Sequence, residues 1–131
     1  MNENLIDFQI LGDERGSLIS LEGTKNVPFD IKRVYYIFGT KMGVRRGFHA
    51  HKNLQQILIA VNGSCKVHLN DGSQTREVIL SKPNKGLQIN GLVWREMYDF
   101  TDDCVLLVLA NNYYDEDDYI RDYEKFVEAV K

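Results

Sequence analysis

The chain has 131 residues, of which 44% are hydrophobic and 27% are charged, and its formal net charge is −3. This length suits one domain that buries its own core without staples, and we expect that domain to cover residues 1–131. The small negative charge gives no reason to expect a nucleic-acid partner, and no apolar stretch is long enough to predict a membrane span.

Short runs with β character dominate residues 5–110. Residues 17–22 alternate between polar and apolar side chains, as in a half-buried strand, and residues 31–38 are rich in the β-branched and aromatic residues that strands prefer. Roughly nine or ten such runs, separated by turn signals, predict a sandwich or barrel, the jelly roll among them. The expected strands cover residues 5–10, 17–22, 31–38, 55–61, 65–70, 75–80, 86–89, 96–100 and 104–110.

The spacing of the apolar side chains changes from a strand period to a helical period near the C-terminus. Tyr119, Tyr123 and Phe126 recur at helical spacing, and the acidic run 115–118 puts negative charge where a helix dipole favours it. We therefore expect a short C-terminal α-helix over about 115–130, packed on the outside of a barrel of about 5–110. The acidic run is interpreted as the start of this helix and not as a ligand.

The two cysteines indicate a reducing environment. Cys65 and Cys104 both lie in apolar runs, which predicts buried free thiols and fits a cytoplasmic protein. Residues 1–4 lack the basic and apolar regions of a signal peptide, which agrees with that location.

The most informative stretch contains His49 and His51. In an extended strand, side chains two positions apart share a face, so the two imidazoles point the same way while Phe48 and Ala50 supply an opposite, packed face. Two imidazoles on one barrel strand favour either metal ligation or proton transfer, and two solvated histidines are the weaker alternative. Positive charge gathers just before them, as an anion site requires, at Lys41, Arg45 and Arg46.

This stretch resembles the first motif of the cupin superfamily. In that motif a glycine is followed after five residues by His-x-His, and then by a glutamate and a second glycine. Gly43, the histidine pair and Gly63 keep the spacing, but Gln56 stands at the glutamate position.

The second cupin motif normally supplies another metal-binding histidine, and residues 90–95 contain none. Two imidazoles, an amide and the nearby cation of Arg95 make a poor divalent site. We therefore predict no metal, and interpret the imidazoles, whose pKa values naturally lie near working pH, as general acid/base groups.

Two arginine motifs suggest the substrate. The segments Asp-Glu-Arg-Gly at 13–16 and Arg-Gly-Phe-His at 46–49 resemble signature positions of cupins that act on dTDP-4-keto-6-deoxy sugars, where arginines bind the diphosphate. Guanidinium groups suit this task because they form bidentate bonds to phosphate. Alone, the first segment is equally well explained as an exposed turn. The resemblance makes Arg15, Arg33 and Arg46 substrate-binding candidates.

Over residues 5–126 the chain resembles the dTDP-4-keto-6-deoxyglucose 3,4-ketoisomerases, most clearly in segments 33–38, 46–52, 62–65 and 108–126. The resemblance implies a jelly-roll homodimer, possibly with exchanged N-terminal strands, that uses no metal or other cofactor. It implies a dTDP-linked 4-keto-6-deoxy sugar as the bound partner. It also implies a place in dTDP-3-amino-3,6-dideoxyhexose synthesis for bacterial surface glycans.

A 3,4-ketoisomerisation needs a base that removes the C3 proton and an acid near the two oxygens. It also needs a group that stabilises the enediolate. We assign His51 as the carbon base and His49 as the group that handles oxygen, although the two roles can be exchanged. Tyr35 lies in phase with Arg33 on the preceding strand, so it faces the cavity or serves equally well as a core aromatic. Gln56 is expected to hydrogen-bond the sugar.

The chain departs from the family at residues 94–97, where Trp-Arg-Glu-Met replaces the common Trp-His-Glu-Met. Arg95 cannot act as a general acid at neutral pH, because its pKa exceeds ~12, but it can stabilise an enediolate or anchor a substrate oxygen. Since the usual histidine is missing, we slightly prefer the gluco over the galacto product. Trp94 is interpreted as structural or as a platform for thymine, and His68 as lying outside the barrel.

Two other functions compete. A dTDP-4-keto-6-deoxyglucose 3,5-epimerase shares the arginine motifs and the first deprotonation at C3, but such epimerases are considerably longer. A non-catalytic sugar-binding cupin would keep the arginines and need neither histidine.

Overall fold

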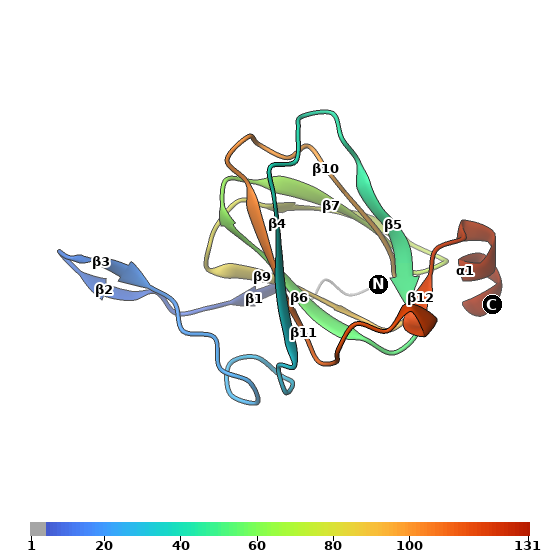
Figure 1. Ribbon diagram of the computed structural model, residues 1–131, viewed down its shortest axis with the longest axis horizontal. Coiled ribbons are helices and arrows are strands. Elements are labelled where there is room, and N and C mark those ends of the chain that lie inside the picture. The colour runs from blue at the N-terminus through green and yellow to red at the C-terminus, as the bar shows by residue number, and fades with distance from the viewer. Residues whose placement is uncertain (1–4) are drawn as a thin grey trace.

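A computed structural model describes residues 5–131. The first four residues, on which the signal-peptide argument depends, lie outside the described part. Two five-stranded antiparallel sheets face each other and enclose the main hydrophobic core, and a short helix lies at one end (Figure 1). This architecture confirms the all-β, cupin-type jelly-roll fold with a short C-terminal helix.

The strands of the two sheets alternate along much of the chain, so residues distant in sequence become neighbours. In spatial order the first sheet contains β1 (Leu5–Asp7), β9 (Lys85–Asn90), β6 (Gln55–Asn62), β11 (Val105–Ala110) and β4 (Arg33–Phe38). The second contains β12 (Tyr119–Ile120), β5 (Arg46–His51), β10 (Trp94–Tyr98), β7 (Cys65–Asn70) and β8 (Thr75–Leu80).

Alternation along β7 separates core from surface as the sequence predicts. Cys65, Val67 and Leu69 are buried, and His68 lies on the outer face, where its Nδ1 contacts the Glu77 carboxylate on β8. Cys65 is a free thiol, as is the buried Cys104 that precedes β11. The predictions for His68 and for both cysteines are therefore confirmed.

The N-terminal strands are shorter than the sequence predicts. The strand expected at 17–22 ends at Leu18, because Ile19 and Leu21 pack as loop residues against an apolar cluster that includes Val27. Their alternation reflects packing and not strand pairing. The first strand is also shorter, because β1 ends at Asp7. Further along the chain, β4 begins two residues later than expected, and β10 is shifted to 94–98 from the expected 96–100.

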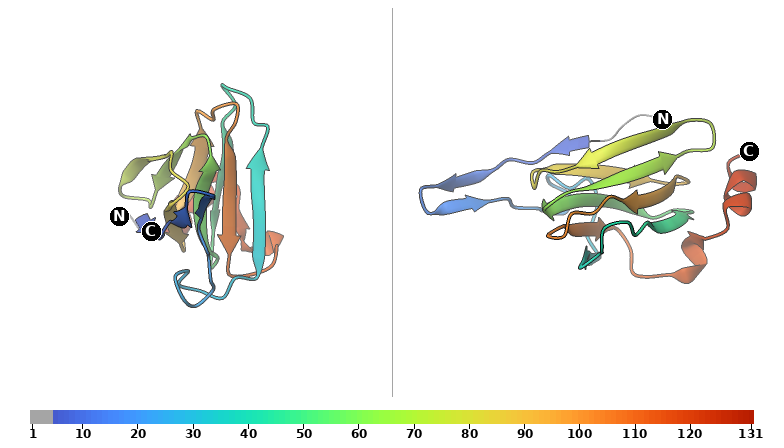
Figure 2. Two further views of the ribbon diagram at one scale, coloured as in Figure 1. Left: turned by 90° about the vertical axis from the view of Figure 1, so that its left-hand side faces the viewer. Right: turned by 90° about the horizontal axis from the view of Figure 1, so that it is seen from above.

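A two-stranded hairpin projects from the barrel, made of β2 (Leu11–Asp13) and β3 (Gly16–Leu18). Figure 2 shows it extending from the end of the molecule opposite the C-terminal helix. Ile10, Leu11 and Leu18 are exposed along it.

The prediction of one helix over about 115–130 is wrong for the first half of that range. Residues 116–118 form a 3₁₀ turn, η1 (Glu116–Asp118), and β12 then pairs with β5 before the helix α1 (Tyr123–Ala129) begins. The Asp122 side chain starts α1 by accepting hydrogen bonds from two backbone amides, at Glu124 and Lys125. The aromatic spacing continues across both elements, so periodicity alone did not reveal the intervening strand.

Helix α1 packs on the outer face of the second sheet, as predicted. Phe126 is fully buried against Ala50, Trp94 and Ile120. Trp94 also donates its indole N–H to Glu96 over 2.8 Å, which supports the structural interpretation of this residue over thymine stacking. Among residues 5–131, no helix is long and apolar enough to cross a membrane.

The turn at Asn62-Gly63 requires glycine at its second position, and this requirement can be tested. Gly63 has φ of +64°, and a Cβ placed there would lie 2.8 Å from Cα of Cys104. We expect Gly63→Ala to lower the free energy of unfolding by about 3 kcal/mol, from backbone strain together with the clash. Gly91→Ala is the control, since Gly91 has φ of +70° but open space around its Cβ position, and should lose only about 1 kcal/mol. Urea denaturation measures both, and equal losses would contradict the steric argument.

Candidate active site

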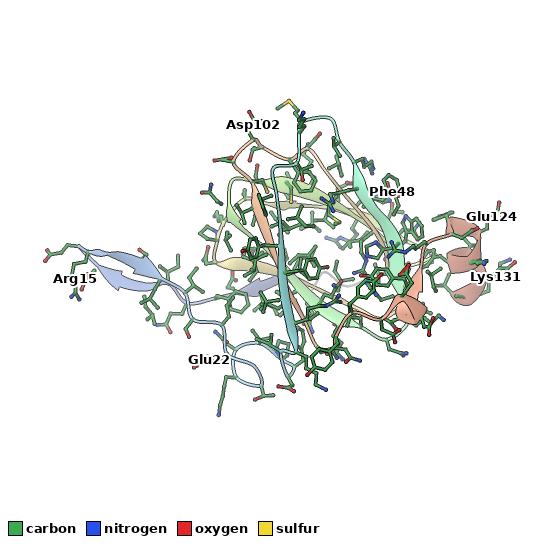
Figure 3. All side chains as sticks on the ribbon, in the orientation of Figure 1. Arg15, Glu22, Phe48, Asp102, Glu124 and Lys131 are labelled. Carbon is green, nitrogen blue, oxygen red and sulfur yellow. The ribbon has the colours of Figure 1, made fainter. Side chains whose placement is uncertain are left out.

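A β-bulge in β5 sets the direction of the two histidines. Gly47 and Phe48 both have positive φ, at +102° and +54°, and the pairing with β10 shifts at this point. Phe48 is the extra residue and is exposed, which corrects the expectation that it packs opposite the histidines (Figure 3). Beyond the bulge the strand alternates regularly, so His49 and His51 share the inner face while Ala50 lies beneath α1.

The two imidazoles form a contact pair but face different cavities. Their ring centroids are 4.9 Å apart with the planes nearly perpendicular. His49 lines a cavity of about 390 Å³ together with Tyr35, Arg33 and Arg46. His51 is fully buried and lines a smaller cavity of about 210 Å³. Of the pair, His49 is therefore the one that a molecule in the larger cavity touches.

A hydrogen-bonded chain runs behind the larger cavity. Arg95 donates from Nη1 to Oε1 of Gln56 over 2.6 Å, and Gln56 donates from Nε2 to the Tyr35 hydroxyl over 3.0 Å. Arg95 also donates from Nη2 to the carbonyl of Val93 over 3.0 Å. Because the Tyr35 oxygen already accepts a bond, its own proton is free to be donated elsewhere.

These hydrogen bonds change the interpretation of three predicted residues, Gln56, Arg95 and Tyr35. Gln56 and Arg95 are 1% and 2% exposed and bond within the protein, so they support Tyr35 from behind instead of facing the cavity. Tyr35 lines the cavity, as one of its two sequence interpretations requires. The donor set does not fit the metal of other cupins, because the position of the usual glutamate holds an amide that is bonded to a guanidinium cation.

Burial and positive charge keep both histidines neutral. Burial, reinforced by the Arg95 cation, lowers the pKa of His49 to about 4 and lowers that of His51 further. The His49 Nδ1 lies 3.0 Å from the carbonyl oxygen of Gly47, so Nδ1 carries the proton and Nε2 carries the lone pair. His49 is thus a neutral base at physiological pH. Burial also lowers the pKa of Arg95 to about 10, which still leaves it a cation.

The arginines separate into two groups. Arg33 and Arg46 line the larger cavity, and the Arg33 guanidinium lies 5.2 Å from the centre of the Tyr35 ring. Arg15 lies at the tip of the hairpin, with its side chain 86% exposed and paired with Asp13 (Figure 3). The single chain therefore does not bring Arg15 to the site. Of the basic cluster predicted before the histidines, Arg45 instead pairs with Glu96.

The sequence missed the contribution of the C-terminal segment. Tyr119 on β12 lies against both imidazoles, with centroid distances of 5.0 Å to His49 and 4.3 Å to His51. Tyr114 and Arg121 join it on the wall of the larger cavity. No local signal marks these residues, because they reach the site only when β12 pairs with β5.

The acidic run was interpreted only partly correctly. Asp115 caps η1, as a helix-start residue does. Asp118, in contrast, points its carboxylate at the His51 ring, 3.1 Å from Nδ1. The two residues are 67 positions apart in the sequence, so helix-start chemistry was the only interpretation that local spacing offered.

The depressed pKa of His49 predicts an acid-tolerant enzyme. With the neutral imidazole serving as a general base, kcat/KM is expected to fall only as pH approaches 4, and not near the ordinary histidine value of about 6.5. A profile of kcat/KM from pH 4.5 to 8 tests this, and an acidic limb centred near 6.5 would contradict it.

Stability should change in the same pH range. Between about pH 6.5 and 4 the unfolded chain protonates histidines that the folded protein keeps neutral, so the free energy of unfolding should fall as pH falls. Thermal melts recorded alongside the rates distinguish loss of fold from loss of the base.

A jelly-roll barrel that holds neutral imidazoles on the wall of an arginine-lined cavity has the architecture of a cupin-type enzyme. The family model described as FdtA (WxcM-like, C-terminal) matches residues 1–131. The chain belongs to this family of 3,4-ketoisomerases.

Three relatives illustrate the similarity. The TDP-4-oxo-6-deoxy-alpha-D-glucose-3,4-oxoisomerase of Aneurinibacillus thermoaerophilus is 54% identical, over 99% of this chain and 94% of the relative. The 3,4-ketoisomerase of Thermoanaerobacterium thermosaccharolyticum, solved as a mutant in complex with TDP-4-keto-6-deoxyglucose, is 48% identical with a TM-score of 0.96, over 98% and 94% of the two chains. The TDP-quinovose 3,4-ketoisomerase of Campylobacter jejuni is 49% identical with a TM-score of 0.92, over 97% and 98%.

Proposed function

We propose that the chain converts dTDP-4-keto-6-deoxy-D-glucose into a dTDP-3-keto-6-deoxyhexose without a metal or other cofactor. The observation that carries the proposal is the larger cavity, where the neutral base His49 and the hydroxyl of Tyr35 lie on one wall with two arginines. The names of the relatives, which act on or bind this sugar nucleotide, support the choice of substrate.

The geometry favours exchanging the two histidine roles. His49 lines the larger cavity together with both Arg33 and Arg46, whereas His51 is fully buried beside the smaller cavity, which only Arg33 of the two arginines lines. We therefore assign His49 as the base that removes the C3 proton. His51 supports it from behind, in contact with the His49 ring.

The reaction balances with groups of this site. Nε2 of His49 takes the proton from C3, and electrons move from the C3–H bond into a C3=C4 double bond and onto O4. The Tyr35 hydroxyl protonates O4 and then recovers a proton from O3. A solvent proton is added to C4 as the C3 ketone forms, and His49 releases the C3 proton to solvent. The Arg95 cation, linked to Tyr35 through Gln56, stabilises the negative charge that develops on the oxygens.

The face of C4 that receives the proton determines the product. We propose the gluco product, which requires C4 to be protonated from the face opposite the one where His49 takes the C3 proton. Arg95 in place of a histidine and the similarity to a TDP-quinovose enzyme support this choice. The coupling of H4 to H5 in the proton NMR spectrum measures it, because the coupling is large in gluco and small in galacto.

The same proposal includes a homodimer with exchanged N-terminal hairpins. The hairpin carries exposed Ile10, Leu11 and Leu18, and the outer face of the edge strand β4 exposes Val34, Tyr36 and Phe38. Covering both surfaces with a second copy buries apolar area and closes an open sheet edge. It also carries Arg15 away from its own barrel toward the partner, where it can bind the diphosphate.

One incubation distinguishes the competing functions. With dTDP-4-keto-6-deoxyglucose in deuterated water, a ketoisomerase gives a 3-keto product with deuterium at C4. A 3,5-epimerase labels C3 and C5 instead, and a sugar-binding protein changes nothing. Full activity after exhaustive chelation should accompany the first result, and a loss that added metal restores would refute the metal-free mechanism.

A further inference from the structure

Asp118 anchors the C-terminal segment to the end of β5 through three hydrogen bonds. Its Oδ2 lies 3.1 Å from Nδ1 of His51, and its Oδ1 accepts the backbone N–H of Asn53 over 2.9 Å. Its backbone carbonyl accepts the N–H of Lys52, also over 2.9 Å. The carboxylate is therefore held in one orientation against the imidazole.

This contact determines the tautomer of His51. A carboxylate only accepts hydrogen bonds, so Nδ1 of the neutral ring must carry the proton and Nε2 the lone pair. Nε2 is buried and has no hydrogen-bond partner among the described residues. The His49 and Tyr119 rings, 4.9 and 4.3 Å away between centroids, hold the imidazole plane in place.

We infer that Asp118 is a positioning residue, which keeps the His51 ring in the orientation and tautomer that present a free Nε2 lone pair within the active site. The inference rests on the proposed function. During turnover the lone pair of His51 takes the C3 proton from His49 on its way to solvent, and the Asp118 carboxylate stabilises the imidazolium that forms in between. The C-terminal segment is thus part of the catalytic apparatus and not only a cover for the barrel.

Asp118→Asn tests the inference with almost no change of shape. The Asn53 N–H needs an oxygen opposite it, so the new amide keeps its oxygen there and turns its NH₂ group toward His51. That group donates to Nδ1 and forces the ring proton onto Nε2. We expect kcat to fall by at least about 100-fold with KM changed less than about threefold, as when a buried partner that sets a histidine tautomer is lost.

The matched control is Asp117→Asn, an exposed acid in the same 3₁₀ turn, which should leave kcat unchanged. ¹⁵N NMR of the His51 ring gives a readout that a merely structural role would not move. It should show a protonated Nδ1 in the wild type and a protonated Nε2 in Asp118→Asn. Full kcat in Asp118→Asn, or a wild-type ring protonated at Nε2, would overturn the inference. The NMR measurement needs no turnover, so an inactive wild type with a protonated Nδ1 refutes the proposed function while the positional assignment holds.

Discussion

Replacing His49 with asparagine is expected to lower kcat by roughly 1,000-fold, the contribution of a well-placed general base. Asparagine is close in size and polar but cannot take a proton at neutral pH. His49 lies on the wall of the larger cavity, and within residues 5–131 its ring makes one hydrogen bond, to the carbonyl of Gly47, so the barrel should keep its fold. Binding of dTDP, measured by calorimetry, should change little, and the loss should appear in kcat.

The comparison with His51 decides which histidine is the carbon base. His51→Asn is expected to reduce kcat less than His49→Asn, and His49→Asn should block exchange of the substrate C3 proton with deuterated water altogether. His68→Asn, on the outer face of the barrel, is the control and should be fully active. If C3 exchange survives in His49→Asn but is lost in His51→Asn, the base is His51.

Replacing Arg15 with alanine is expected to raise KM about 10- to 100-fold, the value of a charge-assisted bond to phosphate. The single chain offers no reason for such an effect, because the Arg15 side chain is 86% exposed at the tip of the hairpin. Sedimentation should find the wild type at twice its mass of 15.2 kDa. A monomer with full activity would refute the exchanged hairpin.

Mixed dimers show which subunit Arg15 serves. Arg15→Ala and His49→Asn proteins are each impaired, and their subunits are exchanged by mild denaturation and refolding. If Arg15 serves the partner, a mixed dimer contains one intact site, with His49 from the first chain and Arg15 from the second. Activity should then rise well above that of either parent at low substrate concentration.

The control pairs two defects that belong to the same barrel. His49→Asn and His51→Asn subunits both carry a damaged histidine pair, so mixing them should restore nothing. If mixing Arg15→Ala with His49→Asn also restores nothing, Arg15 acts in its own subunit or not at all.

The sequence by itself determined the fold class and the centre of the site. Strand alternation reports which side of a sheet is buried, so Cys65, Val67 and Leu69 were correctly placed inside and His68 outside. The same two-residue period put His49 and His51 on one face, and Tyr35 in phase with Arg33. Such properties follow from the geometry of one strand and need no knowledge of its neighbours.

Contacts between distant segments were decided only by the tertiary structure. The bulge at Phe48 depends on the register between β5 and β10, and the Arg95–Gln56–Tyr35 chain depends on three strands that meet across the barrel. Gln56 was predicted to hydrogen-bond the sugar, and its sequence neighbours could not reveal that its side chain bonds to the buried Arg95 and to Tyr35.

The C-terminal segment shows this limit most clearly. Its aromatic spacing predicted one helix, yet pairing with β5 turns residues 119–120 into a strand and brings Asp118 to His51 across 67 positions. The hairpin shows the opposite case, since folding carries Arg15 away from the barrel to which its sequence motif assigned it. Local sequence determines which side chains share a face. The pairing of strands far apart in the chain determines which of those faces come together in the site.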